Sequence, residues 1–251
     1  MKIFYYTASG NSLAVAKEFP KADLVSIPGI LKTKERYFSD ESIGFVFPCY
    51  VASVPTLVEK FLTQSQFQAP YIFAVITYGN TDMGALSQLG RLARKNQIPL
   101  SYVNHLCMVD SSIKYFDMDE EIQNQGGKRI DHHLAQIVSD IENRKEKSPP
   151  CNIIKLQLSK IGRCLYHREI GDVDRKFSVE SHCTGCGVCA RVCPMDNIIV
   201  APRPMFSHNC IRCYACTHNC PENAIRLKGE KSRARFRNSS VSLAEIINAN
   251  I

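Results

Sequence analysis

Eight of the twelve cysteines in this 251-residue chain fall into one short block, in two runs of the same spacing. Each run reads C-x2-C-x2-C-x3-C-P; the first comprises Cys183, Cys186, Cys189 and Cys193, and the second Cys210, Cys213, Cys216 and Cys220. Three thiolates two residues apart on a tight loop can bind three irons of a cubane cluster. The fourth iron needs a cysteine from elsewhere, because one short loop cannot reach around the whole cluster.

The two runs are expected to exchange their fourth ligands, as such tandem motifs do. This rule groups Cys183, Cys186 and Cys189 with Cys220, and groups Cys210, Cys213 and Cys216 with Cys193. An internal repeat supports a paired module, since CPMDNI at 193–198 corresponds to CPENAI at 220–225.

Zinc sites and disulfides are the alternatives for so many cysteines. Structural zinc usually takes two CxxC-like pairs, so the third cysteine and the trailing Cys-Pro would be surplus. A disulfide scaffold would spread its cysteines along a short secreted chain. The dense block favours iron–sulfur clusters in a reducing, cytoplasmic environment. Cys49, Cys107, Cys151 and Cys164 fit no ligand spacing and are expected to be packing residues.

Residues 178–227 resemble a two-cluster, bacterial-type [4Fe–4S] ferredoxin, with all eight ligand positions present. The resemblance implies a small α+β domain, two [4Fe–4S] clusters and electron transfer as the chemistry.

The first 147 residues alternate apolar strand-like runs with helical segments. The predicted strands are Lys2–Thr7, Asp23–Ile27, Ser42–Pro48, Tyr71–Thr77 and Leu100–Val109, and the main helices are Asn11–Phe19, Val54–Gln64, Gly84–Asn96 and Ile130–Glu146. The pattern predicts an α/β fold with a doubly wound, five-stranded parallel sheet, whose strands are buried on both faces. Ligands of such sheets bind at the carboxyl ends of strands, which directs attention to the loops at Thr7, Pro48 and Thr77.

The loop after the first strand reads Thr7-Ala8-Ser9-Gly10-Asn11-Ser12 and lacks both the dinucleotide and the P-loop glycine patterns. Its three hydroxyls, glycine and asparagine at the start of a helix suit a phosphate monoester. An ordinary strand–turn–helix with a serine or asparagine cap is the alternative.

This T-x-S-G-N-S segment resembles the phosphate loop of flavodoxins, [ST]-x-T-G-N-T, with Ser9 and Ser12 in place of the more usual threonines. The resemblance implies bound flavin mononucleotide (FMN), with the loops after strands three and four closing on its ring. The residues this implicates, beside Thr7, Ser9, Gly10, Asn11 and Ser12, are Pro48, Tyr50, Val51, Ala52, Thr77, Tyr78, Gly79, Asn80 and Gly84. Tyr50 and Tyr78 could stack on a flat ring, although either could also be an ordinary packing residue.

Nearly the whole chain, all but 228–251, resembles the flavodoxin–ferredoxin fusion proteins of anaerobic bacteria and archaea. The expected domains are a flavodoxin-like domain at 1–147, a connecting segment at 148–177 with a further helix over 153–169, and the ferredoxin-like domain at 178–227. A basic tail at 228–251 follows, with a short helix over 241–251.

Charge and hydropathy limit the classes of partner that the chain is expected to bind. The strongest apolar run, 72–76, is far shorter than the roughly 18 residues of a membrane span, and the first residues lack the features of a secretory signal. The formal charge of +7 includes six Lys and Arg residues at 226–237. The implied cofactors would bring the charge to about +1. With no interleaved aromatics or known module, nucleic acid is disfavoured; an acidic redox partner or a plain solvated tail ranks higher.

The sequence therefore predicts an electron carrier that interconverts the two-electron traffic of FMN and the one-electron traffic of two clusters, with no catalytic side chain. One alternative is a flavin-dependent reductase of small quinones or nitro compounds. The other is a redox-sensing regulator that uses the basic tail as its effector.

Overall fold

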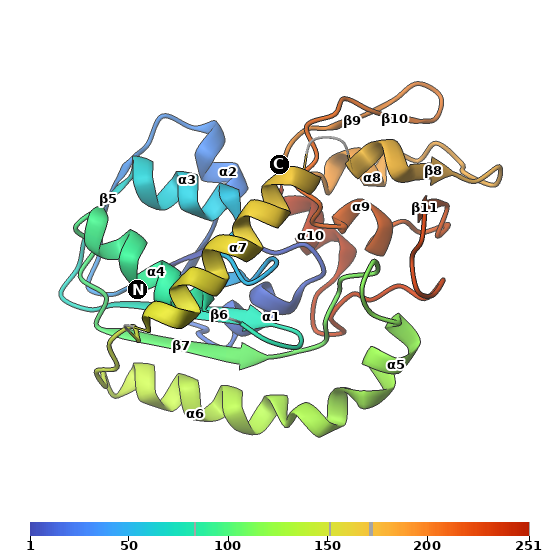
Figure 1. Ribbon diagram of the computed structural model, residues 1–251. Helices are drawn as coiled ribbons and strands as arrows, with labels where there is room; N and C mark the ends of the chain where they lie inside the picture. The colour runs from blue at the N-terminus through green and yellow to red at the C-terminus, as the bar shows by residue number, and fades with distance from the viewer. Residues whose placement is uncertain (83, 151, 171–172, 251) are drawn as a thin grey trace.

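A computed structural model describes residues 1–82, 84–150, 152–170 and 173–250 (Figure 1). Its centre is a five-stranded parallel sheet in the order β2-β1-β4-β6-β7, formed by β1 (Lys2–Tyr5), β2 (Asp23–Ser26), β4 (Ile43–Pro48), β6 (Ile72–Tyr78) and β7 (Tyr102–Cys107). Renumbered along the chain, this is the flavodoxin-like order 2-1-3-4-5. The predicted fold class is confirmed.

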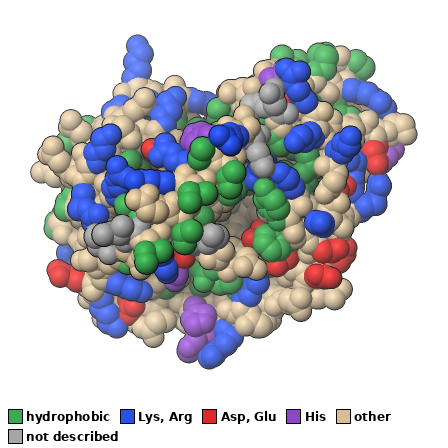
Figure 2. All heavy atoms as spheres, viewed as in Figure 1, with side chains coloured by type: hydrophobic (Ala, Val, Ile, Leu, Met, Phe, Trp, Pro, Cys, Tyr) green, Lys and Arg blue, Asp and Glu red, His purple; other side chains and the backbone are tan. Residues whose placement is uncertain are grey.

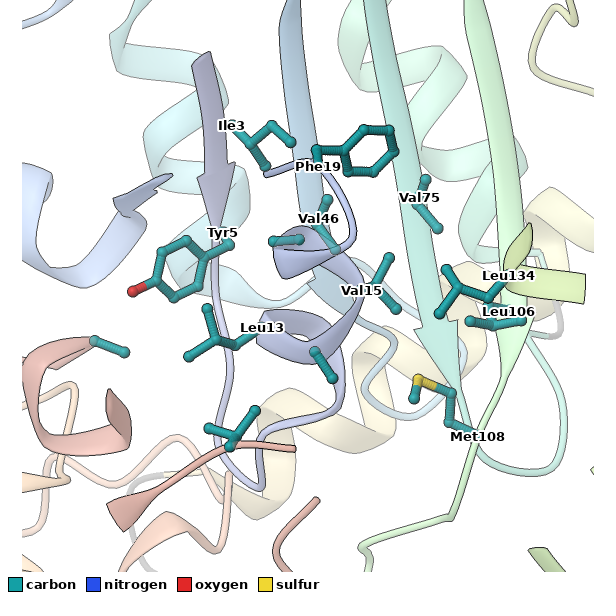
Figure 3. Close-up of a cluster of buried hydrophobic side chains, with 14 of the residues drawn as sticks. Ile3, Tyr5, Leu13, Val15, Phe19, Val46, Val75, Leu106, Met108 and Leu134 are labelled. Atoms are coloured by element: carbon teal, nitrogen blue, oxygen red, sulfur yellow. The ribbon is translucent and has the colours of Figure 1, made fainter. Parts of the chain in front are cut away.

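Both faces of the sheet are buried, which explains the unbroken apolar runs of β4 and β6. Side chains alternate between the faces: Ile3, Val46 and Val75 point to the face shown in Figure 3, where α1 (Asn11–Lys17) packs. α6 (Ile130–Glu142) covers the same face. The opposite face is covered by α2 (Ile27–Lys32), α3 (Thr56–Gln64) and α4 (Ala85–Lys95).

Several elements are shorter than predicted. α3 begins at Thr56 because Pro55 is its N-cap, and α6 ends at Glu142 because Arg144 adopts a positive φ of 50°. The missed elements are very short: the parallel pair β3 (Tyr37–Ser39) and β5 (Gln66–Gln68), and α5 (Met118–Gln123) with the 3-10 turn η1 (Asn124–Lys128). Strands of three residues carry too little periodicity to be recognised.

The cysteine block forms a small α+β domain built from two related halves. β8 (Phe177–Val179) pairs antiparallel with β11 (Ile225–Leu227), and β9 (Ile198–Val200) pairs antiparallel with β10 (Pro204–Phe206). The one-turn helices α8 (Val188–Arg191) and α9 (Ala215–His218) occupy equivalent places in the two halves, and the 3-10 turn η2 (Val173–Lys176) leads into the domain.

Two further helices connect the sheet with the cysteine domain. α7 (Ile153–Glu169) runs from beside α4 toward the cysteine domain (Figure 1). α10 (Leu243–Asn248) starts in a capping box of Ser242 and Glu245 and is tied to α1 by a 2.7 Å ion pair between Lys17 and Glu245. Cys151 and Ile251, predicted to lie in the connecting segment and the terminal helix, fall outside the described residues.

The hydrophobic core does not stop at the edge of the flavodoxin-like sheet. The cluster that contains Ile3 and Val15 also contains Val192 of the cysteine domain and Ile246 of α10. Ile211, between two cysteines, belongs to the core on the other face. The cysteine domain is therefore packed against the sheet rather than tethered to it.

Gly44→Ala tests this packing. Gly44 of β4 lies beside Phe73 of β6, and a Cβ at position 44 would meet the Phe73 ring at 2.3 Å. Because the ring is fully buried and cannot move away freely, we expect a loss of about 1–3 kcal/mol. The measurement is the urea midpoint under anaerobic conditions. Gly126→Ala is the control, since its added methyl group meets no atom within 4 Å; an equal midpoint for both variants would contradict the prediction.

Candidate functional site

A cavity of about 400 Å³ lies at the carboxyl edge of the parallel sheet, within the size range of small-molecule sites. Four loops line it, those that follow β1, β4, β6 and β7. The surface is hollowed here, with hydrophobic side chains around the hollow (Figure 2). The cavity therefore lies where the parallel sheet predicts a ligand.

All but two of the residues predicted for FMN line this cavity. Those brought together are Thr7, Ser9, Asn11, Ser12, Pro48, Tyr50, Val51, Ala52, Thr77, Tyr78, Gly79 and Asn80. Gly10 and Gly84 are not in the wall. Both have a positive φ, and each allows another chain segment to approach: Gly10 faces Asn238, and Gly84 faces the carbonyl oxygen of Lys155.

The β1 loop gives one end of the cavity a set of buried hydroxyl groups. Thr7 Oγ1 accepts a hydrogen bond from the Gly10 amide at 3.0 Å. Ser9 Oγ donates to Ser111 Oγ at 3.1 Å, and the hydroxyls of Ser12 and Thr77 lie 2.9 Å apart. These contacts hold the hydroxyls in place and use two of their protons, that of Ser9 and one of the Ser12–Thr77 pair. The protons of Thr7, Ser111 and the other member of that pair can be donated to an anionic oxygen group.

The loop after β4 is conformationally strained. Val51 and Ala52 have φ angles of 47° and 62°, a region that costs a β-branched residue free energy. Tyr50 precedes them, with its hydroxyl 3.3 Å from that of Tyr6, and burial raises the pKa of Tyr50 well above its usual value. Tyr50 therefore gives this part of the cavity wall an uncharged aromatic side chain, next to a strained turn.

Three groups of wall residues were not predicted from the sequence, and the first lies on the loop after β7. This loop contributes Val109, Asp110, Ser111, Ser112, Tyr115 and Phe116. Burial raises the pKa of Asp110. The rule that ligands bind at strand carboxyl ends applied equally to this strand, so the signal was present.

The second group lies on α7, which covers the cavity from outside the sheet. Leu158, Ile161, Gly162, Leu165 and Tyr166 line the wall. The helix is fixed by Ser159, whose hydroxyl donates to Gln88 at 3.1 Å, and by a 2.8 Å ion pair between Arg163 and Glu59. Gly162 faces the Val51 carbonyl, where a Cβ would lie 2.6 Å from the oxygen. Nothing local in the sequence shows where this helix packs.

The third group comes from the cysteine domain itself: Arg212, Cys213 and Tyr214. The buried guanidinium of Arg212 lies 5.5 Å from the ring centroid of Tyr115 and 5.7 Å from that of Tyr166. Tyr166 also donates a hydrogen bond to the Ile211 carbonyl. A predicted cluster ligand, Cys213, therefore lies in the wall of the cavity.

The eight clustered cysteines surround two further, smaller cavities. The first cysteine set, which lines one of them, comprises Cys183, Cys186, Cys189 and Cys220. The second cysteine set, which lines the other, comprises Cys193, Cys210, Cys213 and Cys216. Ile225 lines the first and Ile198 the second. Among the described residues, no three His, Cys, Asp or Glu side chains converge as closely as one metal ion requires. Four thiols spread around an enclosed space fit a cubane.

The surroundings of these thiols disfavour free thiolates. Burial raises the pKa of Cys210 and Cys213 to about 12 and that of Cys189 to about 11. Without metal the thiols would therefore stay protonated at neutral pH, and metal binding would release their protons. Backbone amides point at the sulfur atoms: the amides of Arg212 and Ala224 lie 3.3 Å from the Sγ atoms of Cys210 and Cys220. Such donors stabilise sulfur-borne negative charge.

The sequence predicts the basic tail to be a docking surface for an acidic partner or a plain solvated segment, but the fold itself uses part of it. Arg226 is buried, the side chain of Arg235 is 8% exposed, and both pair with Glu230. Arg233 pairs with Glu180 at 2.8 Å. Half of the six basic residues are thus used within the fold, which weakens the regulator alternative in which this segment acts as an effector.

Comparison with protein-family models gives one match, to a 4Fe-4S dicluster domain over residues 175–221, a range that includes all eight clustered cysteines. The comparisons with curated proteins and with solved structures gave no match. No helix in the described ranges is long and apolar enough to cross a membrane. The C-terminal part of the chain is thus similar to iron–sulfur electron-transfer domains, on a chain whose N-terminal part has a flavodoxin-like fold.

Proposed function

We propose that this protein is an electron carrier that holds FMN in the cavity and two [4Fe–4S] clusters at the two cysteine sets, and exchanges electrons with a redox partner protein. One observation carries the proposal. Cys213 belongs to the second cysteine set and also lines the cavity that holds the hydroxyl loop of Thr7–Ser12. A ligand in this cavity would contact a cluster-binding residue directly.

The residues of the cavity fit FMN. Hydroxyl groups lie at the β1 loop, where a phosphate would accept their hydrogen bonds. Tyr50 and Tyr78 supply aromatic surface, and the volume of about 400 Å³ suits a ligand of this size. When bound, FMN supplies two-electron chemistry with one-electron steps, which a cluster by itself does not.

The two cysteine sets lie at different distances from the cavity. Cys213 is in the wall, whereas no cysteine of the first set lines it. Cys189 of the first set packs in one apolar cluster with Cys193 and Cys216 of the second. Cys186 is exposed. The second set therefore lies next to the cavity, and the first set lies between the second set and the surface. This order gives electrons a path from a partner docked near Cys186 to the cavity.

Arg212 places a buried positive charge between the second set and the cavity. Its guanidinium is held against Tyr115 and Tyr166, and its own amide points at Cys210. A positive charge in a low-dielectric site favours added negative charge nearby. Arg212 therefore favours electron acceptance at both neighbouring centres.

The reductase alternative is supported by the mouth of the cavity. Leu158, Ile161 and Leu165 of α7 line it and are 41%, 59% and 51% exposed. A small apolar acceptor could enter past these side chains. Steady-state reduction of a quinone by a nicotinamide donor, with no partner protein present, would favour this alternative; its absence favours the carrier.

The ligand grouping is tested with two double variants. Cys193→Ala with Cys210→Ala removes two ligands of one proposed set, and should leave one fully ligated cluster and about four irons. Cys193→Ala with Cys186→Ala takes one ligand from each set, and should leave no fully ligated cluster. Iron analysis and paramagnetic resonance of the reduced proteins distinguish the two. The reverse result would show that each motif keeps its own fourth cysteine.

The phosphate end is tested with Ser12→Ala. Loss of a buried hydroxyl that donates to the phosphate should weaken FMN binding about tenfold, whereas riboflavin, which has no phosphate, should bind nearly as before. Quenching of flavin fluorescence measures both affinities. Ser87→Ala removes a buried hydroxyl outside the cavity wall and serves as the control. An equal loss for FMN and riboflavin would mean that Ser12 does not meet the phosphate.

The electron path is tested with the Cys193→Ala, Cys210→Ala protein, which keeps Cys213 in the cavity wall. With the second cluster absent, flavin reduction by a reduced ferredoxin should lose most of its rate, because the first cluster does not border the cavity. Stopped-flow absorbance records the flavin. If the rate equals that of the unaltered protein, electrons reach the flavin without passing through the second cluster.

A further inference from the structure

Two consecutive side chains at the end of α9 connect the cysteine domain to loops of the cavity. His218 Nε2 lies 2.7 Å from the Ser111 carbonyl oxygen, and Asn219 Nδ2 donates to the Ala8 carbonyl at 3.0 Å. Both residues are buried, with exposed fractions of 4% and 2%. They reach two separate loops, those that follow β7 and β1.

The chain after the cysteines completes these contacts. The Phe236 amide donates to His218 Nδ1 at 3.1 Å, so Nδ1 is the acceptor and Nε2 carries the proton that it donates to Ser111. The Asn238 amide donates to the Ser9 carbonyl at 2.8 Å, and the Asn238 side chain donates to Asn11 Oδ1 at 3.2 Å. The outer side of the hydroxyl loop is held by hydrogen bonds from the C-terminal third of the chain.

These contacts determine how the hydroxyl loop is presented. In a trans peptide the N–H points away from the carbonyl of the same unit. With the Ala8 carbonyl turned toward Asn219, the Ser9 amide is turned away from α9. Asn219 therefore sets the orientation of a peptide unit within the loop proposed to bind phosphate.

α9 cannot hold this position by itself. It is a single turn of four residues, Ala215–His218, and an isolated turn is unstable in water. Cys213 and Cys216 lie at its start and within it, and Cys220 follows directly after Asn219. Ligation of these cysteines would fix α9 from both ends.

We infer that α9 couples cluster assembly to flavin binding, with His218 and Asn219 as positioning residues for the two cavity loops. The inference rests on the proposed function, since it needs FMN in the cavity. Coupling of this kind is reciprocal. Bound clusters raise the affinity for FMN, and bound FMN raises the affinity for iron by the same factor.

The internal repeat supplies a control on the equivalent helix, α8. The positions before Cys193 in the first half are Arg191 and Val192, which correspond to His218 and Asn219 before Cys220. Arg191 is exposed, and Val192 is a buried apolar residue of the core. The iron-binding motif itself therefore does not require a polar pair at these positions.

The test compares Asn219→Ala with Arg191→Ala in cluster-loaded protein. We expect both to hold about eight irons, with FMN bound about tenfold more weakly by Asn219→Ala only. Flavin fluorescence quenching gives the affinity and iron analysis the loading. Equal FMN affinity for the two variants would overturn the coupling. If the unaltered, loaded protein binds no FMN, the proposed function itself fails.

A second measurement needs no variant and covers the case in which Asn219→Ala loses iron. The fraction of iron retained at equilibrium with a competing chelator is measured in unaltered protein with and without saturating FMN. The coupling requires greater retention with FMN bound. Equal retention would overturn it, whatever the variant does.

Discussion

The second cysteine set packs against the carboxyl edge of a parallel sheet, and the rest of the molecule is arranged around that constraint. A cubane needs four thiolates, and one of the four residues proposed to supply them, Cys213, also lines a ligand-sized cavity. Desolvation raises the pKa of this thiol to about 12, so its place is compatible with a charged ligand role only when iron offsets the cost. Backbone amides aimed at the sulfurs and the nearby Arg212 supply part of the compensation.

α7 and the segment after the cysteines lie outside the sheet and the cysteine domain, and both help to hold the two together. α7 spans the cavity mouth and is held by Gln88, Glu59 and the Ile211 carbonyl, so it contacts both modules at once. The segment after the cysteines returns to α1, where Glu245 pairs with Lys17. A flavodoxin-like sheet and a ferredoxin-like domain joined by a free linker would exchange electrons only on encounter. In this structure the sheet and the cysteine domain are packed together, and both contribute residues to the wall of the cavity.

Much of the sheet was predictable, because parallel strands buried on both faces leave unbroken apolar runs such as 72–76. The cysteine grouping is a prediction from spacing, because a short loop cannot surround a cubane, and the same two sets line the two smaller cavities. The three-residue strands β3 and β5 were not, since their pairing arises from contact between distant segments. The ion pair of Arg233 was missed for the same reason, since its partner Glu180 is 53 positions away.

The sequence by itself determined the fold class and predicted the phosphate-type loop and the two sets of thiol ligands, because each depends on local periodicity or on spacing within a few turns of chain. Only the tertiary structure decided that Cys213 borders the cavity, that α7 covers it, and that His218 and Asn219 reach the loops at Ser111 and Ala8. Those contacts join residues about 100 to 200 positions apart. They depend on how whole elements pack, and packing is a property of complementary surfaces rather than of any one segment.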